Sequence, residues 1–177
     1  MTGLTPKWDA RFLRIAREVS TWSKDPSTQV GAVIVAPDRS IVSTGYNGLP
    51  RGVPDDPAIL DDRERKLTCI LHAEENAILK AGRHAAGCSI YIHPFPPCGH
   101  CASLVIQSGI KRVVSPAIEL PERWADQFRA ANDMMTAAGI EVVRTAIAGN
   151  APNREQAFLQ VLSRHRKLMQ LLSYMGD

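Results

Sequence analysis

The sequence predicts an α/β fold: a mixed five-stranded sheet covered by helices. After a β-hairpin near residues 29–45, helical and strand patterns alternate three times, and such alternation implies βαβ crossovers with parallel strands. The chain has 177 residues, of which 45% are hydrophobic and 22% charged, enough to bury one sizeable core without disulfides. We therefore expect one α/β domain over residues 1–147, followed by a linker and an extra C-terminal helix in 148–177.

The first part of the chain supplies a helix and the hairpin. Apolar residues over 8–22 recur at spacings of three and four, which predicts an amphipathic helix. A β-branched run at 29–35 and a second apolar run at 41–45, joined by turn residues, predict the hairpin. Residues 46–66 carry glycines, prolines and many charges, and we expect them to form a long loop of the kind that is often functional.

The remainder supplies the alternating helices and strands. Short helices are expected over 72–81 and 98–108, each ended by a glycine, and a longer one over 122–138. Strands are expected over 88–92, 112–114 and 140–147. Asn153 and Gln156 form a capping-box pattern that predicts the start of a final helix reaching about residue 175.

Charge and composition exclude several classes of protein. The net charge is +3, from 21 basic and 18 acidic residues, which is too mild for the basic footprint of a duplex-binding protein. No stretch of about 18 apolar residues occurs, so no membrane span is expected. Residues 1–8 lack the basic-then-apolar pattern of a secretory signal, which points to the cytoplasm.

Two short segments combine the residue types that zinc prefers. His72-Ala73-Glu74 and Pro97-Cys98-Gly99-His100-Cys101 each fall at the N-terminus of a predicted helix, where free N–H groups and the helix dipole stabilise thiolates. One imidazole and two thiolates, from His72, Cys98 and Cys101, leave the fourth tetrahedral position for water, as catalytic zinc requires. Zinc lowers the pKa of such a water toward roughly 7, and Glu74 would take its proton.

The combination of H-x-E with P-C-x-x-C is the signature of zinc nucleobase deaminases. Beyond it, the sequence resembles the deoxycytidylate (dCMP) deaminase family. The matching stretches span most of residues 8–147: SKDPSTQVGAVIV (23–35), STGYNG (43–48), HAEENAI (72–78), CGHCA (98–102) and IQSGI (106–110). The resemblance implies the cytidine deaminase-like three-layer α-β-α fold and conversion of dCMP to dUMP and ammonia. It also implies a homo-oligomer, a hexamer or a dimer, with dCTP and dTTP as effectors in some members.

Carried over residue by residue, the resemblance assigns His72, Cys98 and Cys101 to one catalytic zinc ion and Glu74 to proton transfer. Asn47 and Ala73 are expected to contact the nucleotide. Residues 51–66 contain no cysteine or histidine for the second, structural zinc that some members carry. The segment 115–121 lacks the tyrosine that many members have there.

A nucleotide substrate also needs a cation near its 5′-phosphate. The candidates by position are Lys24, Arg51, Lys66 and Arg83. Arg51 and Arg83 lead because the guanidinium group offers phosphate a bidentate fork, whereas for any one of these side chains a solvated surface charge is the favoured interpretation.

Other interpretations stay open. Cys69 or Cys88 could complete a closed structural zinc site, although both are expected to be small buried residues. His93 and His100 flank the motif and are interpreted as supporting or surface groups. Within deaminases, the substrate could be a free nucleoside, a modified cytosine nucleotide or a nucleic acid, although the weak basic character argues against a polynucleotide. A catalytically silent regulatory subunit would have no reason to keep Glu74.

Overall fold

The computed structural model of the chain describes residues 5–120 and 122–145, and these confirm the predicted α/β class. The chain divides into two units, Met1–Ala146 and Ile147–Asp177, and everything below concerns the first. The linker and final helix predicted within 148–177 therefore lie outside the described residues. Within the described part, no helix has the length and apolar character needed to cross a membrane.

A five-stranded mixed sheet forms the centre of the fold. Its strands are β1 (Gly31–Val35), β2 (Ile41–Tyr46), β3 (Ser89–His93), β4 (Arg112–Pro116) and β5 (Glu141–Thr145), arranged in the order β2-β1-β3-β4-β5. Strand β1 pairs antiparallel with both β2 and β3, whereas β3, β4 and β5 run parallel. The predicted hairpin and the predicted parallel crossovers are both confirmed.

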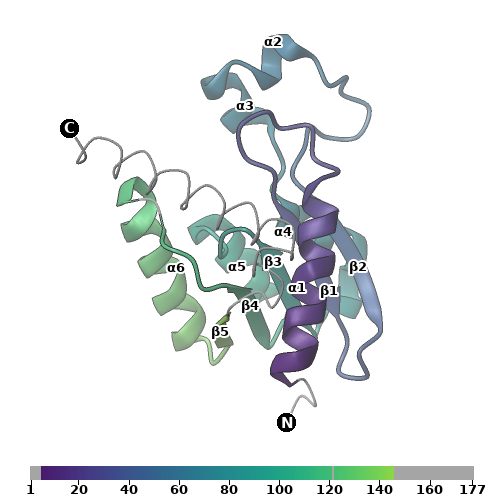
Figure 1. Ribbon diagram of the computed structural model, residues 1–177, viewed down its shortest axis with the longest axis vertical. Coiled ribbons are helices and arrows are strands. Elements are labelled where there is room, and N and C mark those ends of the chain that lie inside the picture. The colour runs from purple at the N-terminus through teal and green to yellow at the C-terminus, as the bar shows by residue number, and fades with distance from the viewer. Residues whose placement is uncertain (1–4, 121, 146–177) are drawn as a thin grey trace, which may run out of the picture. The chain divides into compact units, whose positions relative to one another are not determined.

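Helices cover both faces of this sheet (Figure 1). On one face lies α1 (Pro6–Ser20), whose Phe12 ring packs 5.1 Å from the Tyr91 ring of β3. Ile90 and Ile92, the neighbours of Tyr91, point to the other face and join a core with residues of α4 (Ala73–Ala81), α5 (Gly99–Gln107) and α6 (Ala125–Ala137). This alternation along a strand follows from its two-residue period and produces the three layers.

Two glycines let helices lie against the backbone of the hairpin. A Cβ at Gly31 would collide with the backbone of α1 at Ala16 and Ser20, and a Cβ at Gly45 would collide with the backbone of α4 at Ala73 and Ala77. Glycine permits such close approach because it has no side chain. The start of α4 is thereby seated directly on β2.

The segment predicted as a long loop contains two short helices. They are α2 (Pro57–Leu60) and α3 (Arg63–Cys69), and the carboxylates of Asp56 and Asp62 cap their N-termini by accepting backbone N–H groups. Gly48 and Leu71 exchange two backbone hydrogen bonds, of 3.1 and 3.0 Å, and so close the base of this excursion. We call residues 49–70 the α2–α3 arm; Figure 1 shows its helices beyond one end of the sheet.

The structure also contains two short 3₁₀ turns that were not predicted from the sequence. The helix predicted from residue 122 begins with a 3₁₀ turn, η2 (Glu122–Trp124), before α6. A second 3₁₀ turn, η1 (Gly82–Ala85), follows α4.

A buried ion pair fastens α1 to the sheet. The guanidinium group of Arg112 on β4 donates to both carboxylate oxygens of Asp9 on α1, at 2.7 and 2.9 Å, and Tyr91 donates its hydroxyl to the same carboxylate at 2.9 Å. Arg112 also pairs with Glu141 of β5 at 3.0 Å. Each nitrogen of the Arg112 guanidinium group thus has a partner, and these partners lie in α1, β3 and β5.

Candidate active site

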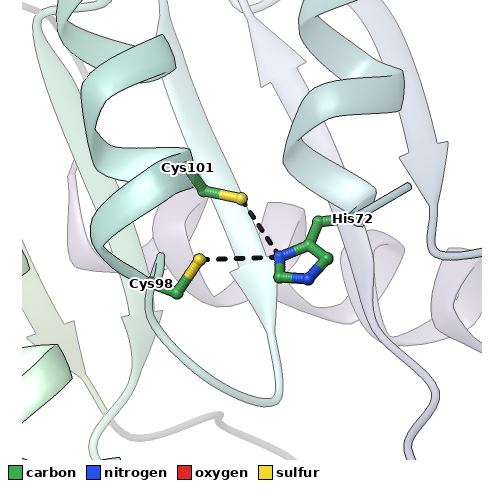
Figure 2. Close-up of side chains that lie close together, drawn as sticks. All are labelled: His72, Cys98 and Cys101. Atoms are coloured by element: carbon green, nitrogen blue, oxygen red, sulfur yellow. Dashed lines mark hydrogen bonds between the residues drawn. The ribbon is translucent and has the colours of Figure 1, made fainter. Parts of the chain in front are cut away.

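The N-termini of α4 and α5 bring the predicted zinc ligands together. His72 is the N-cap residue of α4 and Cys98 is the N-cap residue of α5, with Cys101 in the first turn of that helix. Both helices follow segments that leave the same end of the sheet, so their N-termini face each other. Figure 2 shows the imidazole of His72 pointing at the two sulfur atoms.

The spacing of the three donor atoms fits zinc. Nδ1 of His72 lies 3.6 Å from Sγ of Cys98 and 3.3 Å from Sγ of Cys101, and all three atoms lie within 4.8 Å of one another. Zn–S bonds of about 2.3 Å and Zn–N bonds of about 2.0 Å place the donors of a tetrahedral site roughly 3.5–3.8 Å apart. Among the described residues this group has three members, and neither Cys69 nor Cys88 belongs to it.

The electrostatics of the group favour a cation. Hydrogen bonding from Cys101, and then from His72, lowers the pKa of Cys98 to about 3 despite its partial burial. The hydrogen bond to Cys98 raises the pKa of His72 to about 9, and the same thiolate raises the pKa of Cys101. The cluster therefore holds protons beside a thiolate, and a metal ion binding here would displace them.

Glu74 lies in the first turn of α4 and is only 4% exposed. Burial raises the pKa of its carboxyl group to about 7, outweighing the opposing effects of backbone hydrogen bonding and His72. A carboxyl group with such a pKa can both accept and return a proton near neutral pH. Glu74 does not belong to the group of three donors among the described residues, and its role beside a metal ion stays a prediction.

A second carboxylate joins the two ligand-bearing segments. Oε2 of Glu75 accepts the backbone N–H of His72 at 2.6 Å. Its Oε1 lies 3.1 Å from Nε2 of His100, a residue between the two cysteines in the sequence. His100 is exposed and contacts Glu75, and its role as a supporting group stays a prediction. His93, at the end of β3, is half-buried and burial lowers its pKa.

A cavity of about 700 Å³ opens over this cluster. Its lining comes from the loop before β1, the end of β2, the α2–α3 arm, both ligand-bearing helix starts, the segment between β3 and α5, and the residues at the start of α6. The lining includes His72, Ala73, Glu74 and Cys98, whereas Cys101 lies fully buried behind them.

The predicted substrate contacts are distributed unequally around this cavity. Ala73 and Asn47 line it. The Asn47 amide donates to the carbonyl of Thr28 at 2.9 Å and to Asp25 at 3.3 Å, and its oxygen accepts the N–H of Val30 at 2.8 Å. Asn47 therefore fixes the loop before β1, and its contact with a substrate stays a prediction.

The leading phosphate candidates lie elsewhere. Lys24, Arg51 and Arg83 do not belong to the residues that line the cavity. Lys24 is exposed and pairs with Asp55 at 2.6 Å. Lys66, which the sequence also offered, does line the cavity.

Several lining residues were not predicted as functional. Arg63 of α3 is one, and an aromatic wall of Phe95, Trp124 and Phe128 is another, with the Trp124 ring 5.4 Å from that of Phe95. The wall places an aromatic side chain just beyond the segment in which the expected tyrosine is missing. Cys88 is buried as predicted, whereas Cys69 is exposed because it ends the outer face of α3.

Comparisons with known proteins agree with this site. Residues 6–116 match the family model described as the cytidine and deoxycytidylate deaminase zinc-binding region. An uncharacterized deaminase from the luxG 3′ region of Aliivibrio fischeri is 49% identical over 138 residues, which cover 77% of this chain and 92% of that protein. The deoxycytidylate deaminase of Homo sapiens is 38% identical over 142 residues, covering 76% of this chain and 77% of that protein.

A solved structure supports the fold. The dCMP deaminase of the cyanophage S-TIM5 superposes with a TM-score of 0.63 at 23% identity, covering 80% of this chain and 99% of that one. The family match extends over well more than half of the chain and includes all three donors of the cluster and Glu74. The chain therefore belongs to the cytidine and deoxycytidylate deaminase family and is a zinc-dependent hydrolase.

Proposed function

We propose that this enzyme hydrolyses dCMP to dUMP and ammonia. The observation that carries the proposal is the position of Glu74, a buried carboxyl group lining a cavity directly beside the His72, Cys98 and Cys101 donor cluster. The names of the relatives, deoxycytidylate deaminases that share more than a third of the aligned residues, support the choice of base and sugar.

The residues of the chain divide the work of this reaction. His72, Cys98 and Cys101 would hold zinc, which when bound lowers the pKa of a water molecule and so supplies a nucleophile at neutral pH. Glu74 accepts a proton from that water molecule as the water oxygen bonds to C4 of the cytosine ring. Glu74 passes this proton to N3 and then carries the proton of the new C4 hydroxyl group to the amino group. The C4–N bond breaks as C4 becomes a carbonyl carbon, and ammonia leaves.

The surroundings of Glu74 support this proton transfer. Its pKa of about 7, raised by burial, matches the requirement that one group act as base and then as acid at neutral pH. The aromatic wall of Phe95, Trp124 and Phe128 shields one side of the cavity from water. A planar base could pack against such a surface.

Substitution of Glu74 by Gln tests the assignment. The variant should retain zinc, because Glu74 is not a donor, and should lose at least a factor of 10²–10⁴ in turnover, the usual contribution of general acid–base catalysis. Ammonia release from dCMP and zinc content per chain are measured on the same preparation. Glu64→Gln, at an exposed carboxylate of α3, is the matched control. A Glu74→Gln enzyme with more than a tenth of the normal rate would contradict the role.

Assembly and regulation are proposed on the family resemblance, and the compartment and the domain bounds on the sequence patterns. The chain assembles as a homo-oligomer, a hexamer or a dimer, responds to dCTP and dTTP, and works in the cytoplasm. Residues 1–147 form the deaminase domain and 148–177 an appended linker and helix. Light scattering of the zinc-loaded protein, and dCMP turnover with each effector added, test assembly and regulation separately.

A further inference from the structure

One face of α3 runs along the cavity. Arg63, Lys66, Leu67 and Ile70 all line it, and their spacing of three, four and seven residues places them on the same side of a helix. The helix has seven residues and is therefore about 10 Å long. Its C-terminal end leads directly to His72, so Arg63 lies at the end of the face far from the zinc ligands.

Lys66 is not available to a ligand anion. Its side chain is buried, and Nζ donates to Asp25 at 2.8 Å and to the hydroxyl of Ser27. Burial alone would raise the pKa of Asp25, but the hydrogen bonds from Lys66, Ser27 and Thr28 hold it below its ordinary value, so the carboxylate is charged. A phosphate approaching Lys66 would meet this second anion, and the ammonium charge is already balanced.

Arg63 is available. Of the lysines and arginines among the described residues, Arg63 and Lys66 are the two that line the cavity, and Arg63 is exposed at the first position of α3. Within the described part of the chain, its guanidinium group has no ion pair or hydrogen bond, and none joins it to Asp61, which also lines the cavity. A planar guanidinium matches two phosphate oxygens at once.

We propose that Arg63 binds the 5′-phosphate of the nucleotide and makes the enzyme prefer a nucleotide to a nucleoside. The inference rests on the proposed function in taking a cytosine nucleotide as the ligand. The base lies beside Glu74, and the sugar and phosphate extend along the α3 face toward Arg63. The α2–α3 arm thus binds the phosphate of the nucleotide, while α4 and α5 carry the residues that act on its base.

The helix supplies its own control residue. Arg65 carries the same charge two positions further along α3, on a different side of the helix, and does not line the cavity. Its guanidinium group donates to the carbonyl of Ala58 at 3.4 Å within the arm. Replacing Arg63 or Arg65 removes the same charge from the same short helix, but only Arg63 faces the ligand.

Equilibrium binding to the zinc-loaded Glu74→Gln protein tests the proposal without turnover. In this background, Arg63→Ala should weaken dCMP binding roughly 10- to 100-fold, the loss expected for a charge-assisted pair, and leave deoxycytidine binding unchanged. Arg63→Lys should bind dCMP with intermediate affinity, because it keeps the charge and loses the fork. Arg65→Ala should bind both ligands as the parent protein does.

Three results would overturn the inference. The first is unchanged dCMP affinity in Arg63→Ala, and the second is an equal loss for dCMP and deoxycytidine, which would indicate a damaged pocket. The third is a parent protein that binds both ligands equally well. Ammonia release from dCMP by the unsubstituted enzyme is measured in parallel, and its absence would refute the proposed reaction, whereas the binding comparison decides the role of Arg63.

Discussion

At the scale of single residues, Glu75 has the most specific supporting role in the site. One carboxylate oxygen holds the backbone of His72 and the other holds the side chain of His100, so one side chain spans the starts of α4 and α5. We expect these two contacts of Glu75 to help set the distance between the His72 nitrogen on α4 and the Cys98 and Cys101 sulfur atoms on α5. Groups that orient ligands in this way commonly affect metal affinity 10- to 100-fold.

Substitution of Glu75 by Ala should therefore weaken zinc binding, by about 10-fold. His100→Ala should weaken it less, because Glu75 then still accepts the His72 N–H. Zinc affinity is measured by competition with a chromophoric chelator, with Glu64→Ala as the control for loss of one carboxylate. Equal affinities for Glu75→Ala and the unsubstituted protein would show that the bridge has no influence on the ligands.

At the scale of elements, the ion pair between Lys66 and Asp25 joins α3 to the loop before β1. Both side chains are buried, and the pair closes one wall of the cavity. Asn47 binds the same loop from the end of β2. The loop before β1 thus connects α3 with the end of β2.

The pKa of Asp25, held below its ordinary value, gives this contact a defined pH dependence. A carboxyl group with a depressed pKa contributes stability above the ordinary value of about 3.9, and the contribution is lost as the pH falls through its lower folded value. Asp25→Asn leaves Lys66 buried without a counter-charge, so it should lower the free energy of unfolding at pH 7 by about 3 kcal/mol.

The difference between Asp25→Asn and the unsubstituted protein should begin to narrow as the pH falls below about 3.9, the ordinary pKa of Asp, and should reach its minimum below the lower folded pKa of Asp25, where both proteins lack the charge. Urea unfolding of the two proteins at a series of pH values measures it. Loss of metal in acid affects both proteins and cancels in the difference. A gap that stays constant from pH 7 to pH 3 would mean that the charge of Asp25 does not contribute.

Some of these elements could be predicted from the sequence and some could not. The helices that carry His72 and Cys98 were predictable because their start and stop signals are local, and the three donors followed from the residue types at those starts. Helices α2 and α3 were missed because four and seven residues are too few to show a periodic pattern. The burial of Lys66 depends on Asp25, 41 residues away, and no local pattern reports such a pair.

At the scale of the whole molecule, the helix layer formed by α1 is joined to the strands of the sheet by charge as well as by apolar packing. Asp9 of α1 is 3% exposed and is satisfied by Arg112 and Tyr91 of the sheet. Removing one partner of a buried pair leaves an uncompensated charge, which commonly costs about 3–5 kcal/mol. Glu141, the other partner of Arg112, has a side chain that is 59% exposed and should matter much less.

Arg112→Met should accordingly lower the global stability by about 3–5 kcal/mol, and Glu141→Gln by no more than about 1 kcal/mol. Thermal denaturation of both variants checks the order, and zinc content at low temperature confirms that the folded Arg112→Met protein keeps its site. Arg112 begins β4 and pairs with Ser89, the first residue of β3, whereas Cys98 follows the other end of β3. A selective loss of zinc without a loss of stability would therefore contradict this interpretation.

The two backbone hydrogen bonds between Gly48 and Leu71 have a consequence for how the enzyme could change its ligand. They close the base of the α2–α3 arm, so an arm that keeps Lys66, the partner of Asp25, can be exchanged as a cassette. The metal donors belong to helices outside it, whereas Arg63, Leu67 and Ile70 belong to it. Replacing residues 49–70 could thus change the substrate preference while the metal donors and Glu74 stay unaltered.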